Sequence, residues 1–161
     1  MVIKFSSSVL MVKDVNLSRN FYEGLLEQTV ALDHGECLGF VGGFSIWQQD
    51  RAWKIMQFEE DKFPNQSHDH RFELYFETDD LDGILKKIIE AKFELVHEIF
   101  EQPWGQRVLR VFDPDRHLVE LGEPMSVVIR RFLKIGMKVE EVALRTSMPL
   151  EIILEEERLL K

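Results

Sequence analysis

The chain has 161 residues, a formal net charge of −9, 45% hydrophobic and 30% charged residues, a composition typical of one soluble globular domain. The acidic balance argues against non-specific binding to nucleic acid or acidic membranes, and no stretch approaches the roughly 20 apolar residues of a membrane span. Cys37 is the only cysteine, so no disulfide forms within the chain and a reducing cytoplasm fits best.

The first 125 residues contain the same succession of expected elements twice. The first half is expected to form a strand, a helix and three short strands, at 5–12, 17–26, 29–33, 37–41 and 44–49. After a polar segment at 51–69, the second half repeats this order at 71–78, 81–92, 94–100, 106–112 and 117–122. Asp14 or Asn16 is expected to cap the first helix, and Asp80 opens the second, 66 residues after Asp14 (80 − 14 = 66). This period predicts a duplicated module with a groove between its copies, where a ligand site usually lies.

Two strands of the second half combine apolar and charged positions. Because side chains alternate along a strand, the segment at 71–78 has one apolar and one polar face. The apolar face carries Phe72, Leu74 and Phe76, and the polar face carries Arg71, Glu73, Tyr75 and Glu77. The polar face meets either bulk water or a ligand cavity. Glu120 lies between Leu118 and Gly122 on one face of its strand, and such an acid must find a partner or a wet cavity.

After Pro124 the pattern becomes helical, with helices expected at 127–135, 139–145 and 149–160. Ser126 is expected to cap the first of them, and Gly136 to end it. The chain therefore divides into a domain at 1–125 and a helical tail at 126–161.

The tail is similar to a DNA-binding helix-turn-helix in its order of helices, but its charge opposes that function. Its last helix carries Glu151, Glu155, Glu156 and Glu157, which a phosphate backbone would repel. We expect the tail to mediate dimerisation or a partner contact, with Val128, Phe132 and Ile135 along one stripe.

Several short motifs in the two halves resemble those of a known superfamily. They are Val12-Lys13-Asp14-Val15, Ser18, Phe21-Tyr22, Leu25-Leu26, Asp80-Leu81 and Phe112-Asp113-Pro114-Asp115-Arg116-His117-Leu118-Val119-Glu120-Leu121. On these residues the chain, over about 4–123, resembles the vicinal oxygen chelate superfamily, which includes glyoxalase I, bleomycin-resistance proteins and extradiol dioxygenases. The resemblance implies an α+β fold of two tandem βαβββ modules forming a cupped mixed sheet, with the helical tail appended.

The resemblance also implies a site inside the cup. Metal-dependent members hold a divalent ion there, which acts as a Lewis acid on substrate oxygens while a glutamate moves the proton. The matching positions are Glu120 and Glu73, implied as metal ligands and catalytic residues, with Ser7 and Gln48 at the remaining two. This set has no imidazole, so three alternatives stay open: a divalent metal (Mg, Mn, Ni or Zn), a metal-free cup as in the bleomycin-binding branch, or a site whose carboxylates work without an ion.

Other polar and aromatic side chains of the second half are candidate ligand contacts: Tyr75, Trp104, Gln106 and Arg110. Arg110 and Arg107 are the nearby candidates for a cation that compensates two neighbouring carboxylates, and Trp104 is either a core plug or a wall over a planar ligand. Arg116 replaces the usual glycine of the closing turn, and we expect an altered turn there. His68 and His70 are expected to lie in a solvated loop.

Three functions are consistent with these features. The first is a metal-assisted lyase or isomerase acting on an oxygenated or thiol-conjugated substrate. The second is a metal-free binding protein of the bleomycin-resistance type, and the third is a ligand-sensing regulatory module that acts through its tail. In each case the expected partner is a small molecule, not nucleic acid or a membrane, and the protein is expected to be a cytoplasmic homodimer.

Overall fold

The computed structural model describes residues 5–55 and 72–160. These residues fall into two compact units. The first contains the described residues up to Phe72 together with Asp113–His117, and the second contains Glu73–Phe112 together with the described residues from Leu118 onward. No helix within the described ranges is long and apolar enough to cross a membrane. The predicted loop histidines, His68 and His70, lie outside the described residues.

The first unit contains one four-stranded mixed sheet with short helices. Its elements are β1 (Ser8–Val12), α1 (Val15–Arg19), η1 (Asn20–Leu25), β2 (Val30–Asp33), β3 (Cys37–Phe40), β4 (Phe44–Gln48) and α2 (Gln49–Ile55). The strand order is β1-β4-β3-β2, with β1 parallel to β4 and the other neighbours antiparallel. Its core contains an aromatic cluster. The ring centroids of Phe40 and Phe44 lie 4.5 Å apart in a stacked arrangement, and those of Tyr22 and Phe44 lie 5.2 Å apart.

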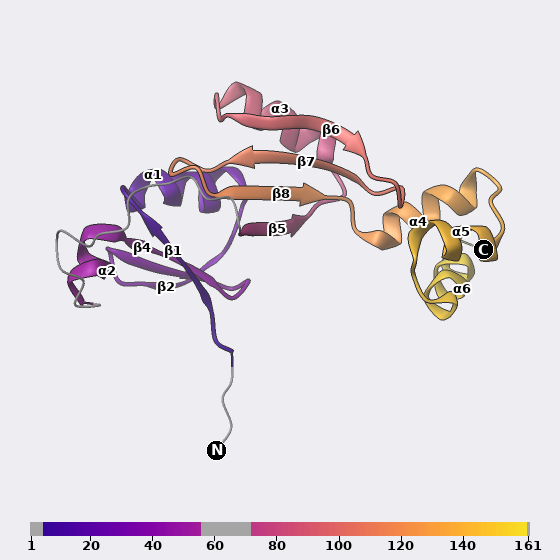
Figure 1. Cartoon of the computed structure of the whole chain (residues 1–161), viewed down its shortest axis with the longest axis horizontal. Coiled ribbons are helices and arrows are strands. Elements are labelled where there is room, and N and C mark those ends of the chain that lie inside the picture. Colours follow the sequence, from indigo (N-terminus) through magenta and orange to yellow (C-terminus); the bar gives the residue numbers. More distant parts are fainter. Residues whose placement is uncertain (1–4, 56–71, 161) are drawn as a thin grey trace, which may run out of the picture. The chain divides into compact units, whose positions relative to one another are not determined.

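The second unit repeats this topology and adds three helices. Its elements are β5 (Glu73–Glu77), α3 (Leu81–Glu90), β6 (Leu95–Glu101), β7 (Arg107–Phe112), β8 (Leu118–Gly122), α4 (Met125–Lys134), α5 (Val139–Thr146) and α6 (Leu150–Leu159). The strand order is β5-β8-β7-β6, again with one parallel pair, and α3 packs along β6 and β7 (Figure 1). The predicted α+β class, with two βαβββ modules and C-terminal helices, is confirmed.

Equivalent aspartates begin the first helix of each module. Asp14 Oδ1 accepts a hydrogen bond from the Asn16 backbone N–H at 2.8 Å, and Asp80 Oδ1 accepts one from the Gly83 N–H at 2.9 Å. Each carboxylate satisfies a backbone donor that the helix itself leaves unpaired. Of the two predicted caps of the first helix, the structure therefore uses Asp14.

Several element boundaries differ from the sequence prediction, and α2 (Gln49–Ile55) overlaps the start of the polar segment expected at 51–69. The first strand begins at Ser8, and the helix predicted at 17–26 changes after Arg19 into a π-helical turn, in which the Leu26 N–H donates to the Phe21 carbonyl. Ser126 was predicted to cap α4, but Pro124 occupies the cap position and the helix begins at Met125. Proline has no N–H to leave unpaired and a φ already near the helical value, so it suits a helix start.

The closing turn of the second module is held by a buried carboxylate. Asp113 Oδ1 accepts hydrogen bonds from the backbone N–H groups of Asp115 at 2.9 Å and His117 at 2.8 Å, while Tyr22 donates to Oδ2 at 2.8 Å. The prediction of an altered turn at Arg116 is wrong, because Arg116 has φ 67°. A left-handed arginine costs about 1 kcal/mol, and the hydrogen bonds to Asp113 outweigh this strain.

His117 gives the fold a pH-dependent contact. Its Nδ1 lies 2.9 Å from Asp113 Oδ2; burial alone would lower the pKa of His117, but the hydrogen bond and charge of Asp113 raise it above the ordinary 6.5. Because the folded-state pKa is the higher one, this stabilisation is fully present below 6.5 and is lost as the pH rises through the folded value.

We therefore expect the difference in unfolding free energy between the wild type and His117→Gln to shrink with rising pH. Urea unfolding of both proteins at about pH 5.5 and about pH 8.5 measures it. A difference that is equal or larger at the higher pH would contradict the ion pair.

The three C-terminal helices have a core of their own. Its buried members are Val128, Ile129, Phe132, Val142 and Ile153. Two residues of the stripe that we predicted for a partner contact, Val128 and Phe132, are thus covered by the tail itself, while Ile135 is 70% exposed. The stripe was misassigned because the sequence does not show that α5 and α6 fold back onto α4.

Gly105 allows Phe132 to reach the sheet. A Cβ at this position would lie 2.1 Å from Phe132 Cζ, and Gly105 has φ 88°. Gly136 has an equivalent φ of 89° but no neighbour within 4 Å of the added atom. An alanine at Gly136 would therefore meet backbone strain alone, whereas an alanine at Gly105 would meet the same strain and a clash with Phe132.

We expect Gly136→Ala to lower the free energy of unfolding by about 1 kcal/mol, from backbone strain alone. Gly105→Ala should cost about 1–3 kcal/mol more, because Phe132 must also move. Chemical unfolding of the two variants measures the difference. Equal losses would show that the tail does not depend on this close approach.

Candidate functional site

One face of the second sheet carries the predicted polar residues. Tyr75 of β5 pairs with Glu120 of β8, and Glu120 pairs with Arg110 of β7. Paired residues on neighbouring strands point to the same side of a sheet. Glu73 and Glu77 lie two residues before and after Tyr75, so their side chains share this face.

Arg110 connects the two predicted catalytic carboxylates. Its Nε lies 3.1 Å from Glu73 Oε2, and its Nη2 forms an ion pair with Glu120 Oε2. Glu120 is 7% exposed, and Glu73 is exposed. The guanidinium thus sits between two negative charges, one buried and one at the surface. His97 of β6, which had no predicted role, lies with its Nε2 3.4 Å from Arg110 Nη1, because the β6 register places it opposite Arg110.

Ser7 and Gln48 belong to the first unit, and each contacts its own surroundings there. The Ser7 hydroxyl lies 3.1 Å from Ser45 Oγ and 2.9 Å from the Ser8 carbonyl. Gln48 Oε1 accepts from the Val15 N–H at 3.1 Å, and its amide nitrogen donates to the Lys13 carbonyl. Gln48 therefore ties the end of β4 to the turn between β1 and α1.

These contacts do not make up a ligand set for a divalent ion. Glu73 and Glu120 share a guanidinium, and neither Ser7 nor Gln48 adds a charge. Across residues 5–55 and 72–160, no group of three or more His, Cys, Asp or Glu side chains could hold a metal. Metal binding at Glu73 and Glu120 stays a prediction that the described donors do not favour.

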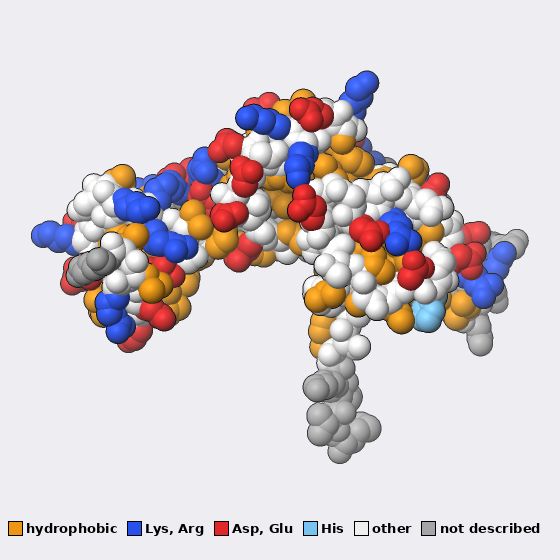
Figure 2. Space-filling view, turned by 180° about the vertical axis from the view of Figure 1, so that it is seen from behind, with side chains coloured by type: hydrophobic (Ala, Val, Ile, Leu, Met, Phe, Trp, Pro, Cys, Tyr) orange, Lys and Arg blue, Asp and Glu red, His pale blue; other side chains and the backbone are white. Residues whose placement is uncertain are grey.

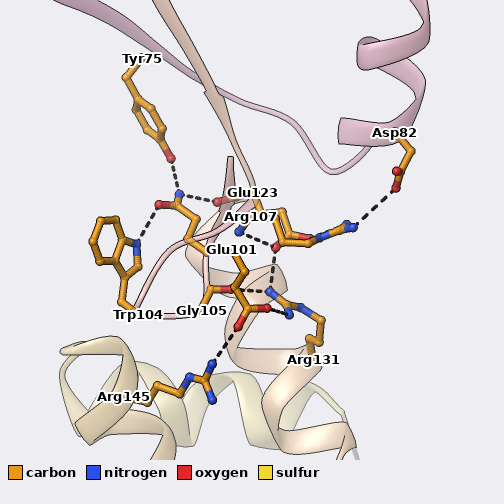
Figure 3. Close-up of polar contacts among 10 residues, drawn as sticks. Tyr75, Asp82, Glu101, Trp104, Gly105, Arg107, Glu123, Arg131 and Arg145 are labelled. Carbon is orange, nitrogen blue, oxygen red and sulfur yellow. Dashed lines mark hydrogen bonds and ion pairs between the residues drawn. The ribbon is translucent and has the colours of Figure 1, made fainter. Parts of the chain in front are cut away.

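Three predicted ligand contacts form a hydrogen-bonded chain (Figure 3). The Trp104 indole N–H donates to Gln106 Oε1 at 3.0 Å, and the Gln106 amide donates to the Tyr75 hydroxyl at 2.8 Å. Gln106, which is 6% exposed, also donates to the Glu123 carbonyl at 2.8 Å. Both amide hydrogens of Gln106 are therefore occupied, and its oxygen accepts from Trp104. Tyr75 in turn donates to Glu77 Oε1 at 3.1 Å. Burial and the charge of Glu77 raise the pKa of Tyr75, so the phenol keeps its proton.

This chain forms one wall of a hollow of about 460 Å³. Tyr75, Glu77, Trp104 and Gln106 line the sheet side, and Met125 with residues 146–148 lines the side of the C-terminal helices. We call this space the tail hollow. Its volume lies within the range of small-molecule sites, and its lining is mainly aromatic and thioether with few polar groups. The sequence predicted its aromatic side but gave no sign of its helical side.

A buried carboxylate fastens the C-terminal helices beside the hollow (Figure 3). The Glu123 side chain is 3% exposed; Oε1 lies 2.8 Å from Arg107 Nε, and Oε2 lies 3.0 Å from Arg131 Nη2 of α4. Glu101 of β6 lies 2.8 Å from both Arg131 Nη1 and Arg145 Nη2 of α5. This network was not predicted from the sequence, although an acid directly after a buried strand was an available sign.

On the surface of the C-terminal helices, basic and acidic side chains are interspersed with hydrophobic ones (Figure 2). Leu144 is 85% exposed and Leu159 is 69% exposed. The homodimer and the dimerising role of the tail stay predictions.

Glu123→Gln should lower the free energy of unfolding by about 2 kcal/mol, because Arg107 and Arg131 lose a buried charged acceptor. Asp82→Asn is the matched control: Asp82 is the other partner of Arg107, at 3.6 Å, but its side chain is 71% exposed. We expect the control to cost less than about 1 kcal/mol. Thermal and urea unfolding compare the two. A loss from Glu123→Gln no larger than the control would show that Glu123 does not hold the helices.

Comparison with known proteins identifies the fold. The family model described as "Glyoxalase-like domain" matches residues 5–126. No curated protein sequence matches. A crystal structure of a protein of unknown function from Agrobacterium tumefaciens str. C58 is similar with 31% identity and a TM-score of 0.69, over 77% of this chain and 96% of that one.

Two more distant solved structures share the fold. One is a glyoxalase-related enzyme from Fulvimarina pelagi, with 15% identity and a TM-score of 0.62 over 78% of this chain and 91% of that one. The other is a glyoxalase/bleomycin resistance protein/dioxygenase family enzyme from Burkholderia phytofirmans PsJN, with 16% identity and a TM-score of 0.64 over 75% and 98%. With its duplicated modules and the match over residues 5–126, the chain belongs to the glyoxalase-like family within the vicinal oxygen chelate superfamily.

Proposed function

We propose that this protein binds a small organic molecule without a metal ion, as the bleomycin-resistance type of the superfamily does. The observation that carries the proposal is the Arg110 guanidinium, which lies between Glu73 and Glu120 and supplies the positive charge that a metal would otherwise bring. The planar guanidinium presents several donors that match carboxylate oxygens, so Arg110 can pair with both acids at once.

The tail hollow supports the same proposal. It offers the aromatic surfaces of Tyr75 and Trp104 next to a small number of polar groups, which is the usual make-up of a small-molecule site. A metal-assisted lyase or isomerase is less well supported, because Glu73 and Glu120 would have to release Arg110 before they could coordinate an ion. That exchange would leave a partly buried guanidinium without its partners.

We expect metal-stripped wild-type protein to bind Mn²⁺ only weakly, and Arg110→Met to bind it at least about tenfold more tightly. The reason is that the variant leaves two adjacent carboxylates without a counter-charge. Isothermal titration calorimetry measures both affinities. Arg19→Met is a matched control, since Arg19 also bridges two acids, Glu23 at 2.5 Å and Asp33 at 2.9 Å, but both are largely exposed. The Arg19→Met variant should bind Mn²⁺ little more tightly than the wild type does.

A neutral probe tests binding itself. 4-Phenylbenzyl alcohol, titrated into the wild type, should bind with the same affinity in the presence and absence of EDTA. Tight stoichiometric Mn²⁺ binding by the wild type, or loss of probe binding with EDTA, would contradict a metal-independent site.

A further inference from the structure

We propose that the tail hollow selects an organic cation, an amine carried on an aromatic or otherwise apolar body. The inference rests on the proposed function for the binding of a small molecule, and adds the chemical class of the ligand and a role for the C-terminal helices. Its starting point is the chemistry that the hollow leaves available once its internal hydrogen bonds are counted.

The internal hydrogen bonds use up the donors of both aromatic rings. The Trp104 N–H is taken by Gln106, and the Tyr75 O–H is taken by Glu77, so neither ring has a polar hydrogen left for a ligand. What remains is ring surface: Tyr75 is 46% exposed and Trp104 is 40% exposed. The faces of such rings carry partial negative charge and attract cations.

Glu77 adds a full negative charge beside these rings. Its carboxylate is exposed and accepts one hydrogen bond, from Tyr75. Among the described residues it has no Lys, Arg or His partner, whereas Glu73, Glu120 and Glu123 each contact an arginine. A carboxylate next to open aromatic surface favours an ammonium group over a neutral or anionic one.

The opposite wall suits the apolar part of the same ligand. Met125 begins α4 and Met148 lies in the connection between α5 and α6, and their flexible thioethers adapt to varied shapes. The Thr146 hydroxyl is already donated to the Val142 carbonyl at 2.7 Å and does not compete for the ligand. The sheet side of the hollow therefore carries the charge, and the opposite side offers the two thioethers with the exposed Ser147 between Thr146 and Met148.

Two features hold the hollow open in advance of binding. Gly122 has no side chain, and a Cβ there would lie 3.0 Å from both Gln106 Nε2 and Tyr75 Cε2. A side chain at this position would push Gln106 and Tyr75 slightly apart, so the glycine lets the two side chains meet closely. The ion pairs of Glu123 and Glu101 with Arg131 and Arg145 fix α4 and α5 next to the sheet. A preformed site loses less free energy to ordering when the ligand arrives.

Three probes with the same biphenyl body test the inference: 4-phenylbenzylamine, 4-phenylbenzyl alcohol and 4-phenylbenzoate, which are cationic, neutral and anionic at neutral pH. In the wild type we expect the amine to bind about fivefold more tightly than the alcohol, and the benzoate to bind weakest. In Glu77→Gln the preference for the amine over the alcohol should shrink to about twofold, because the ring faces of Tyr75 and Trp104 still attract the cation after the carboxylate is gone. Titration calorimetry in the presence of EDTA measures all six affinities.

Glu98→Gln is the charge-matched control, since Glu98 lies exposed on β6 and outside the hollow. It should keep the wild-type preference for the amine. Met148→Ala should weaken amine and alcohol by the same factor, because it removes apolar wall and no charge. Thermal unfolding verifies that each variant is folded.

Equal binding of the amine and the alcohol by the wild type would overturn the inference, as would a preference that is undiminished in Glu77→Gln or is lost in Glu98→Gln. These outcomes leave the metal-independent function standing, since the alcohol still binds. Loss of all binding in EDTA would instead overturn the proposed function.

Discussion

The register between β5, β8 and β7 is the constraint on which the polar face depends. It places Tyr75 opposite Glu120 and Glu120 opposite Arg110, while Val119 and Leu121 point to the other side, into the core. A slip of one residue would turn each of these side chains to the opposite face. The apolar side chains on one face of the sheet therefore determine which charged side chains lie together on the other face. Burial of the core selects the register, and the register brings the carboxylates to the arginine.

Charges that this register buries must find partners, and the sheet and the tail do so in different ways. Glu120 pairs with Arg110, which lies in the same sheet, so this ion pair holds no other element to the sheet. Glu123 is neutralised by Arg107 from the sheet and Arg131 from α4, so the same physical need fastens a helix to a strand. Glu77, at the exposed end of β5, is not buried and so needs no arginine partner, which leaves its carboxylate available to a ligand.

The sequence predicted what depends on neighbouring residues and missed what depends on distant ones. Asp14 and Asp80 could be recognised as caps because each bonds a backbone N–H two or three residues away. Arg110 could be placed near the carboxylates from strand alternation alone. The turn at Arg116 was mispredicted because its small strain had to be weighed against hydrogen bonds to Asp113 that sequence does not display. The tail hollow was out of reach, since its walls come from segments some seventy residues apart, such as Tyr75 and residues 146–148.

The match to the family covers only part of the residues that line the tail hollow. The glyoxalase-like match ends at residue 126, so it includes Tyr75, Glu77, Trp104 and Gln106 but stops before residues 146–148. A relative that shared only the matched segment would present the same aromatic surface without its helical wall. It would leave the ligand's apolar body in water, and affinity gained from that burial would be lost. The selectivity of this site is therefore a property of the two-module sheet and the C-terminal helices together, because the charge that chooses the ligand and the surface that retains it belong to different parts of the chain.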